Sequence, residues 1–148
     1  MNAIRLLFIA FFSFLLLTPA LAEDLGTRAQ NAFKEHLNQA SQAAKDAQTP
    51  QEKRQILNDA FKKLDNVMEK ARSLPAATGQ DLDAIRKFQE SLTEKSDELN
   101  GRNGFSAVPD QQLNQFADYA VQDMEQAERY FTISLTTALL IIIILLLL

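Results

Sequence analysis

The chain has 148 residues, with 15 Lys and Arg against 19 Asp and Glu and a formal net charge of −4. This acidic balance argues against a general affinity for nucleic acid, which needs clustered positive charge. The sequence has no cysteine and one histidine, which excludes disulfides and Cys/His zinc sites, so the fold has to rest on packing.

The N-terminal segment has the pattern of a secretory signal peptide. Arg5 is its only charge, and an almost wholly apolar run follows over Leu6–Leu17. Ala20 and Ala22 place small residues at the two positions that a signal peptidase requires. We expect cleavage after Ala22, which removes residues 1–22. The alternative is an uncleaved anchor, but this apolar run would rise only about 18 Å against a hydrocarbon core of roughly 30 Å.

Residues 23–129 are expected to form one exported domain, because apolar residues recur there at helical spacing. The first helix spans about Asp24–Ala47. The second begins at Thr49-Pro50-Gln51-Glu52, with threonine at the N-cap, proline at the first helical position and glutamate at the third, and Pro75 ends it. The predicted apolar faces are Leu25, Ala29, Phe33, Leu37, Ala40 and Ala44, then Leu57, Ala60, Phe61, Leu64, Val67, Met68 and Ala71.

A third helix is predicted to begin at Thr78-Gly79-Gln80-Asp81 and to end at Asn100-Gly101, where glycine can take the left-handed conformation. A fourth begins near Pro109-Asp110. No Pro or Gly interrupts the chain from Asp110 to Leu148, which predicts one continuous helix running from the domain into a membrane. The predicted faces are Leu82, Ile85, Phe88, Leu92 and Leu99, then Leu113, Phe116, Ala117, Ala120, Val121, Met124 and Ala127.

Each predicted helix of the exported domain carries one phenylalanine, which is what the centre of a small bundle needs. The expected fold is all-α: a small antiparallel bundle of about four helices whose last helix continues into a C-terminal transmembrane span. A looser arrangement of hairpins that completes its core only in an oligomer is the alternative. The four residues are Phe33, Phe61, Phe88 and Phe116.

Residues 130–148 have the properties of a membrane anchor. No charge follows Arg129, and residues 139–148 are only Leu and Ile. As a helix the segment would measure about 28 Å, close to the hydrocarbon thickness. A buried core helix is the alternative, but the rest of the chain is too small to wrap so apolar a segment. The anchor residues are Tyr130 and Phe131 at the interface, then Ile133, Leu135, Leu139, Ile142 and Leu148.

Two further features of this segment leave alternatives open. Ser134 and Ala138 form a small-xxx-small pair that could bring two spans together, although hydroxyls that bond to their own helix are the simpler interpretation. No Lys or Arg follows the apolar run, so the tail is either a permanent span or a signal that is exchanged for a lipid. We favour the permanent span, because the candidate site Asp118-Tyr119-Ala120 contains a bulky tyrosine.

No motif supports catalysis. One histidine, His36, and no Gly-x-Ser-x-Gly elbow leave a catalytic triad unsupported, and no glycine loop for phosphate is present. Glu90, Glu94 and Glu98 recur every four residues and are weak candidates for a divalent-cation site. A solvated acidic face, partly balanced by Lys95, is the favoured interpretation. We expect no catalytic residues, no metal site and no cofactor.

The expected function is that of an exported, membrane-anchored interaction or scaffold protein of a cell envelope. Its domain would face the periplasm from the inner membrane, with lipid and a protein partner or a second copy as its contacts. The acidic segment 103–129 is not expected to bind anionic lipid headgroups. The alternatives are a module for a small ligand or divalent cation, using the acidic face, and a lipid-anchored eukaryotic surface protein.

Overall fold

The computed structural model describes residues 19–128 and 133–147, and every regular element within them is helical. The predicted all-α class is therefore confirmed. The elements are α2 (Pro19–Asp46), α3 (Pro50–Arg72), α4 (Gly79–Asn100), the 3-10 turn η1 (Asp110–Gln112), α5 (Leu113–Glu128) and α6 (Leu135–Leu146). Residues 1–18 of the predicted signal peptide lie outside the described part. Ala20 and Ala22 fall in the first turns of α2, and their side chains also lie outside it.

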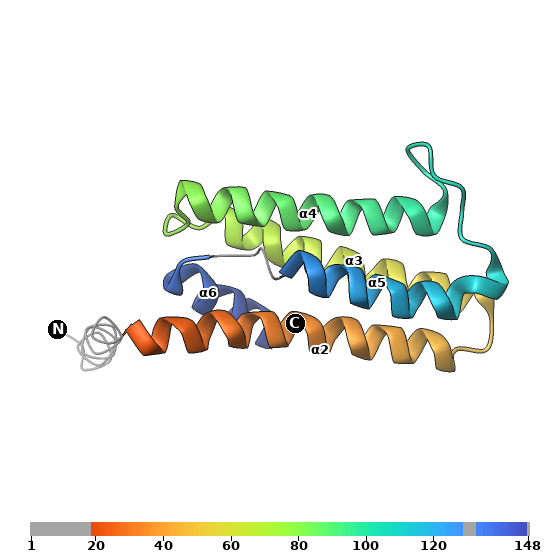
Figure 1. Ribbon diagram of the computed structural model, residues 1–148, viewed down its shortest axis with the longest axis horizontal. Helices are drawn as coiled ribbons and strands as arrows, with labels where there is room; N and C mark the ends of the chain where they lie inside the picture. The colour runs from red at the N-terminus through yellow and green to blue at the C-terminus, as the bar shows by residue number, and fades with distance from the viewer. Residues whose placement is uncertain (1–18, 129–132, 148) are drawn as a thin grey trace.

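Four helices, α2 to α5, lie side by side and alternate in direction along the chain (Figure 1). α2 contacts α3 and α5, and α4 also contacts α3 and α5, so the four close into a ring around one core. This confirms the predicted helical bundle. α6 packs against α2 and α3, toward the end of the bundle where α4 begins (Figure 1).

The boundaries of α3 and α4 follow their predicted caps. The Thr49 hydroxyl accepts a hydrogen bond from the Glu52 amide at 3.2 Å, and the Glu52 carboxylate accepts one from the Thr49 amide at 3.3 Å. Thr78 and Asp81 form the same reciprocal box at the start of α4. At its end, Gly101 takes the left-handed conformation with φ 67°. Short-range sequence signals therefore fix where these two helices begin and where α4 ends.

The four predicted phenylalanines fill the centre of the bundle. None is more than 5% exposed, and the rings of Phe33 and Phe88 have centroids 5.1 Å apart. All seven residues of the predicted α3 face are also buried. The same apolar cluster reaches α6 through Ile141. In the first and fourth predicted faces, Ala40 and Ala127 are only half-buried.

The prediction that Leu82 lies in the core is wrong, because this side chain is 37% exposed. Asp81 beside it is only 1% exposed. At 3.6 residues per turn, Asp81 lies near the middle of the face formed by Ile85, Phe88 and Leu92, whereas Leu82 lies at its edge. The first turn of α4 therefore turns a carboxylate, not a leucine, toward the interior.

Two cations join separate elements of the bundle to one another. Lys95 of α4 is 2% exposed, and its Nζ lies 2.9 Å from Glu98, 3.0 Å from Asp123 and 2.7 Å from the Tyr119 hydroxyl. Burial alone would lower the pKa of Lys95, but these hydrogen bonds and the charge of Asp123 outweigh it and raise the pKa. Since Tyr119 and Asp123 belong to α5, this contact joins α4 to α5.

The second cation, Arg54 of α3, fixes the loop before α5. Its guanidinium donates to the carbonyl of Leu99 at 2.6 Å and to the carbonyl of Val108. It also bonds the Asp110 carboxylate at 3.0 Å. The end of α4 and the start of η1 are thereby held against the same residue of α3.

The predicted continuous helix from Asp110 to Leu148 is wrong. α5 ends at Glu128, and Ser134 has extended backbone angles of φ −64° and ψ 154° before α6 begins at Leu135. The Ser134 hydroxyl accepts from the Thr137 amide at 3.4 Å, which is the bond of an N-cap. A serine cap therefore starts a new helix where no proline or glycine marks a break.

Among the residues that the structure describes, no helix is both long and apolar enough to cross a membrane. The predicted C-terminal span is therefore not confirmed. Of its anchor residues, Tyr130, Phe131 and Leu148 lie outside the described part.

The glycines at the two ends of α4, Gly79 and Gly101, make a matched test of this backbone. A Cβ at Gly101 would lie 2.6 Å from the Ala107 amide nitrogen and would sit on a residue with φ 67°, whereas a Cβ at Gly79 meets nothing within 4 Å. We expect Gly101→Ala to lower the free energy of unfolding by about 1–2 kcal/mol or more. Gly79→Ala should raise it by about 0.4–1 kcal/mol. Urea denaturation measures both, and equal midpoints for the two variants would contradict this backbone.

Candidate functional site: the Asp81 clasp and the apolar helix α6

Asp81 lies at the N-termini of two helices. Within α4 its Oδ2 accepts from the Thr78 amide at 3.0 Å. From α6, Oδ1 accepts from the Ser134 amide at 2.6 Å, and Oδ2 accepts from the Ser134 hydroxyl at 2.8 Å and the Thr137 hydroxyl at 2.9 Å. We call Asp81, Ser134 and Thr137 the clasp.

The electrostatics of the clasp favour the ionised carboxylate. Burial would raise the pKa of Asp81, but the amides of Thr78 and Ser134 and the hydroxyls of Ser134 and Thr137 donate to it and lower the pKa to about 2. Both helix dipoles also place their positive ends toward this side chain. Donors from α4 and α6 therefore stabilise the negative charge, although Asp81 is 1% exposed.

Beyond the clasp, α6 is apolar around its whole circumference but covered on one side only. Thr137, Ala138 and Ile141 are at most 1% exposed and face the bundle. Leu146 and Leu147 are 80% and 82% exposed. Among the remaining anchor candidates, Ile133, Leu139 and Ile142 are half-buried, and the side chain of Leu135 lies outside the described part.

The predicted small-residue pair Ser134 and Ala138 faces the bundle. Ser134 bonds Asp81, and Ala138 has no exposed surface. In the described arrangement these residues pack within one chain, so they are not available to a second span.

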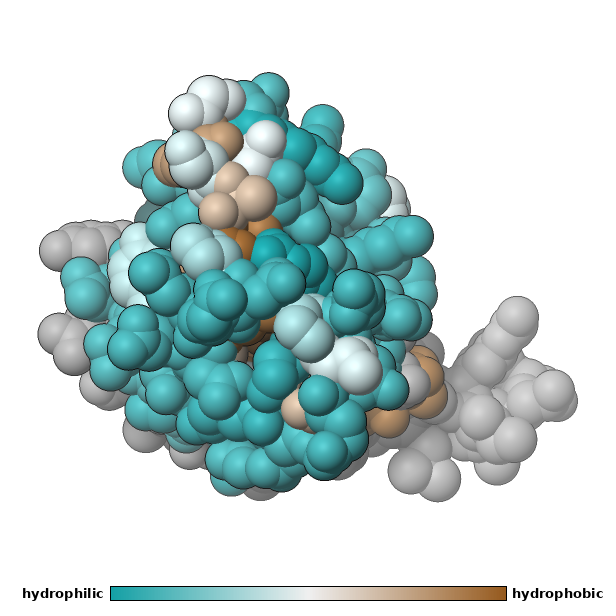
Figure 2. Space-filling view, turned by 90° about the vertical axis from the view of Figure 1, so that its right-hand side faces the viewer, coloured by the Kyte–Doolittle hydropathy of each residue, from teal (hydrophilic) through white to brown (hydrophobic). Residues whose placement is uncertain are grey.

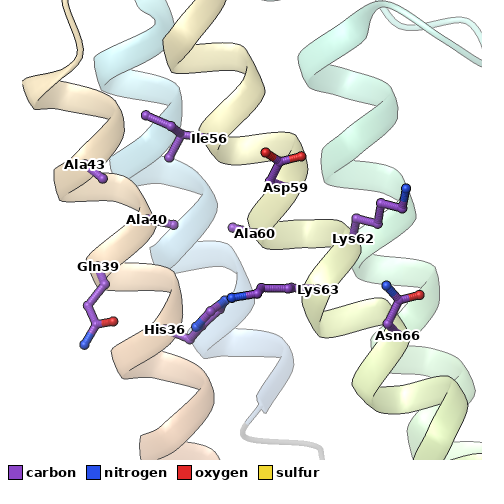
Figure 3. Close-up of a pocket in the computed structure, with 10 residues that line it drawn as sticks. All are labelled: His36, Gln39, Ala40, Ala43, Ile56, Asp59, Ala60, Lys62, Lys63 and Asn66. Carbon is purple, nitrogen blue, oxygen red and sulfur yellow. The ribbon is translucent and has the colours of Figure 1, made fainter. Parts of the chain in front are cut away.

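A groove of about 590 Å³ lies between α2 and α3. His36 and Lys63 point toward each other across it, and Ala40 and Ala60 also line it (Figure 3). Burial lowers the pKa of His36, and the nearby charge of Lys63 lowers it further, which favours the neutral imidazole. None of the residues that Figure 3 labels carries a hydroxyl or thiol, so the labelled residues include no Ser, Thr or Cys nucleophile beside this histidine.

The acidic candidates on α4 do not share a partner. Glu90 lies 3.5 Å from Arg86, Glu98 lies 2.9 Å from Lys95, and Glu94 is exposed. Within residues 19–128 and 133–147, no three acidic or histidine side chains are grouped as a metal ion would require. The pairing places Glu98 in the contact between α4 and α5, where it serves packing of the bundle.

The sequence predicts Asp81 only at the start of the third helix and Ser134 only in the membrane span, and it gives Thr137 no role. The Thr78-to-Asp81 capping box was visible, and so was the spacing of Ser134 and Thr137, which is typical of a helix N-cap. No local sequence pattern predicts the contact between Asp81 and Ser134, which are 53 residues apart.

The clasp predicts how stability depends on pH. A carboxyl whose pKa falls from 3.8 when unfolded to about 2 when folded adds about 2 kcal/mol to the free energy of unfolding. Because the folded value is the lower one, this contribution is complete above pH about 4 and is lost as the pH falls toward about 2. Asp81→Asn should therefore be about 2 kcal/mol less stable than the parent at pH 6, with the gap closing in acid.

Urea denaturation at a series of pH values gives this difference. Asp83→Asn is the matched control, because the Asp83 side chain is 70% exposed and pairs with Arg86 on its own helix. A gap of the same size at pH 2 and pH 6 would contradict the predicted role of the Asp81 charge.

Comparisons with protein-family models, with curated proteins and with solved structures find no match for this chain. Its function therefore has to be inferred from its own residues. The two features that distinguish it are the clasp and the half-covered apolar helix that the clasp holds.

Proposed function

We propose that this chain is an exported, non-catalytic helical interaction protein that attaches to a membrane through its C-terminal apolar segment. The observation that carries this proposal is the mismatch at α6, which is apolar from Ala138 onward but leaves Ile143, Leu146 and Leu147 exposed. Water-exposed apolar surface of this kind marks a site of contact with lipid or protein. Leu146 and Leu147, at 80% and 82% exposure, are its most exposed residues.

The free energy available from this surface is large for so short a helix. Burying a fully exposed leucine side chain contributes about 1.5–3 kcal/mol. Leu146 and Leu147 together therefore favour an apolar environment by several kcal/mol, and the partly exposed Ile143 adds to it. Lipid supplies that environment without any requirement for a complementary shape, so a bilayer is the proposed contact.

The other end of the bundle offers little apolar surface by comparison (Figure 2). The end of the bundle where α2 joins α3 is hydrophilic over most of its area (Figure 2). α5 carries no Lys or Arg of its own, and its acids Asp118, Asp123 and Glu125 each pair with a lysine of another helix, so this face offers no excess of positive charge to anionic headgroups. Insertion of apolar side chains, not attraction between charges, is the proposed source of binding.

The proposed topology has two parts. α6 in its described position is about 18 Å long, so it can lie in the interface between headgroups and hydrocarbon but is too short to span. A transmembrane span requires α6 to leave the bundle and to join the apolar residues before it. The periplasmic side, the inner membrane and the removal of residues 1–22 are inferred from the signal-peptide pattern of the sequence.

Vesicle flotation tests this proposal. The full chain, processed by its host cell, should float with phosphatidylcholine vesicles, and adding phosphatidylglycerol should not increase the bound fraction. Leu146→Asp combined with Leu147→Asp should weaken binding by at least about tenfold, since the charges oppose burial of that surface. These positions pack against little, so the bundle should keep its stability.

The matched control is Phe105→Ser, which removes an exposed aromatic residue, 41% accessible, from the loop between α4 and η1. This variant should float like the parent. A parent that stays unbound, or a Phe105 variant that loses as much binding as the double aspartate variant, would refute attachment through α6.

A further inference from the structure

We propose that the clasp is a latch, an autoinhibitory contact that keeps α6 on the bundle and out of lipid until a bilayer displaces it. This inference rests on the proposed membrane attachment and adds its regulation. The contact consists of three hydrogen bonds from Ser134 and Thr137 to a carboxylate that α4 presents at its own N-terminus.

The clasp is the directional part of the contact between α6 and the bundle. Among the α6 side chains that the structure describes, the other buried ones, Ala138 and Ile141, are apolar, and apolar packing specifies position weakly. The Asp81 carboxylate instead accepts from one backbone amide and two hydroxyls that only the first turn of α6 offers in this arrangement. Charged hydrogen bonds of this kind are roughly twice as strong as neutral ones.

A latch requires that the two positions of α6, on the bundle and in lipid, be close in free energy. On the bundle, α6 covers Ile141 but leaves Leu146 and Leu147 in water. In lipid, all of its apolar side chains would be covered, but Asp81 would lose three of its donors. The Thr137 hydroxyl could then bond back to its own helix, as hydroxyls in membrane helices do. The hydrogen bonds of the clasp thus oppose the free energy gained when lipid covers the apolar side chains of α6.

The exposure along α6 indicates where release begins. The clasp holds the first turn, whereas Ile143, Leu146 and Leu147 at the other end are 43%, 80% and 82% exposed. A bilayer can therefore cover the far end of α6 while the clasp is still closed. Release of the first turn then completes the transfer.

The absence of cysteine from the chain allows a direct test with one reporter at a time. Ala138→Cys places a thiol on the buried side of α6, and Ala117→Cys places one in the core of α5; both positions are 0% exposed. Maleimide labelling of the processed full chain in water, without lipid, should be slow at both. Thr137→Val removes one hydroxyl donor at almost constant volume, and Asp81→Asn removes the charge.

Each of these two variants should speed labelling at position 138 by about tenfold, corresponding to about 1.4 kcal/mol, and leave position 117 slow. Each should also increase the fraction bound to phosphatidylcholine vesicles. Asp83→Asn and Thr93→Val, on exposed positions of α4, are the matched controls and should change neither quantity. If Asp81→Asn also exposes position 117, the bundle has opened, and Thr137→Val decides the question.

The outcomes separate the two proposals. Unchanged labelling at position 138 in Thr137→Val would overturn the latch, while flotation of the parent would still support membrane attachment. Faster labelling without any gain in vesicle binding would show that the clasp holds α6 but does not control its entry into lipid, which also overturns the latch. Failure of the parent to bind vesicles would overturn membrane attachment itself, and the latch with it, whatever the labelling shows.

Discussion

A single carboxylate between two helix N-termini sets the position of the most apolar part of this chain. Asp81 completes the cap of α4 and, through Ser134 and Thr137, the start of α6. A buried charge is costly unless donors surround it, and here the donors come from both helices. Without α6, this carboxylate would keep only part of its partners. The docked helix and the ionised acid therefore depend on each other.

Buried and half-buried polar side chains play the same role elsewhere in the bundle. Arg54 joins α3 to the loop before η1, Lys95 joins α4 to α5, and Asp81 joins α4 to α6. The phenylalanine core supplies burial but little direction, because apolar contacts tolerate many arrangements. Each of these three residues instead forms hydrogen bonds with atoms at fixed positions. We infer that they select one arrangement of helices that the apolar faces alone would leave open.

How far the sequence predicts this structure depends on whether a signal is local. The capping box at Thr49 and the left-handed Gly101 are complete within a few residues, so the helix boundaries there were predictable. Leu82 was misplaced because apolar spacing cannot show that Asp81 holds the inward position. The break at Ser134 was missed for a related reason. Its cap is a local pattern, but the partner that makes it stable lies 53 residues away.

The titration of Asp81, observed by nuclear magnetic resonance through the Ser134 amide, tests the central claim most directly. That amide donates to Oδ1 at 2.6 Å, so protonation of the carboxyl must shift its resonance. The account predicts that, in water without lipid, the Ser134 amide titrates with a midpoint of about 2, together with the Asp81 carboxyl carbon. A Ser134 amide that does not follow the carboxyl, or a carboxyl midpoint near 3.8, would show that α6 is not held by Asp81.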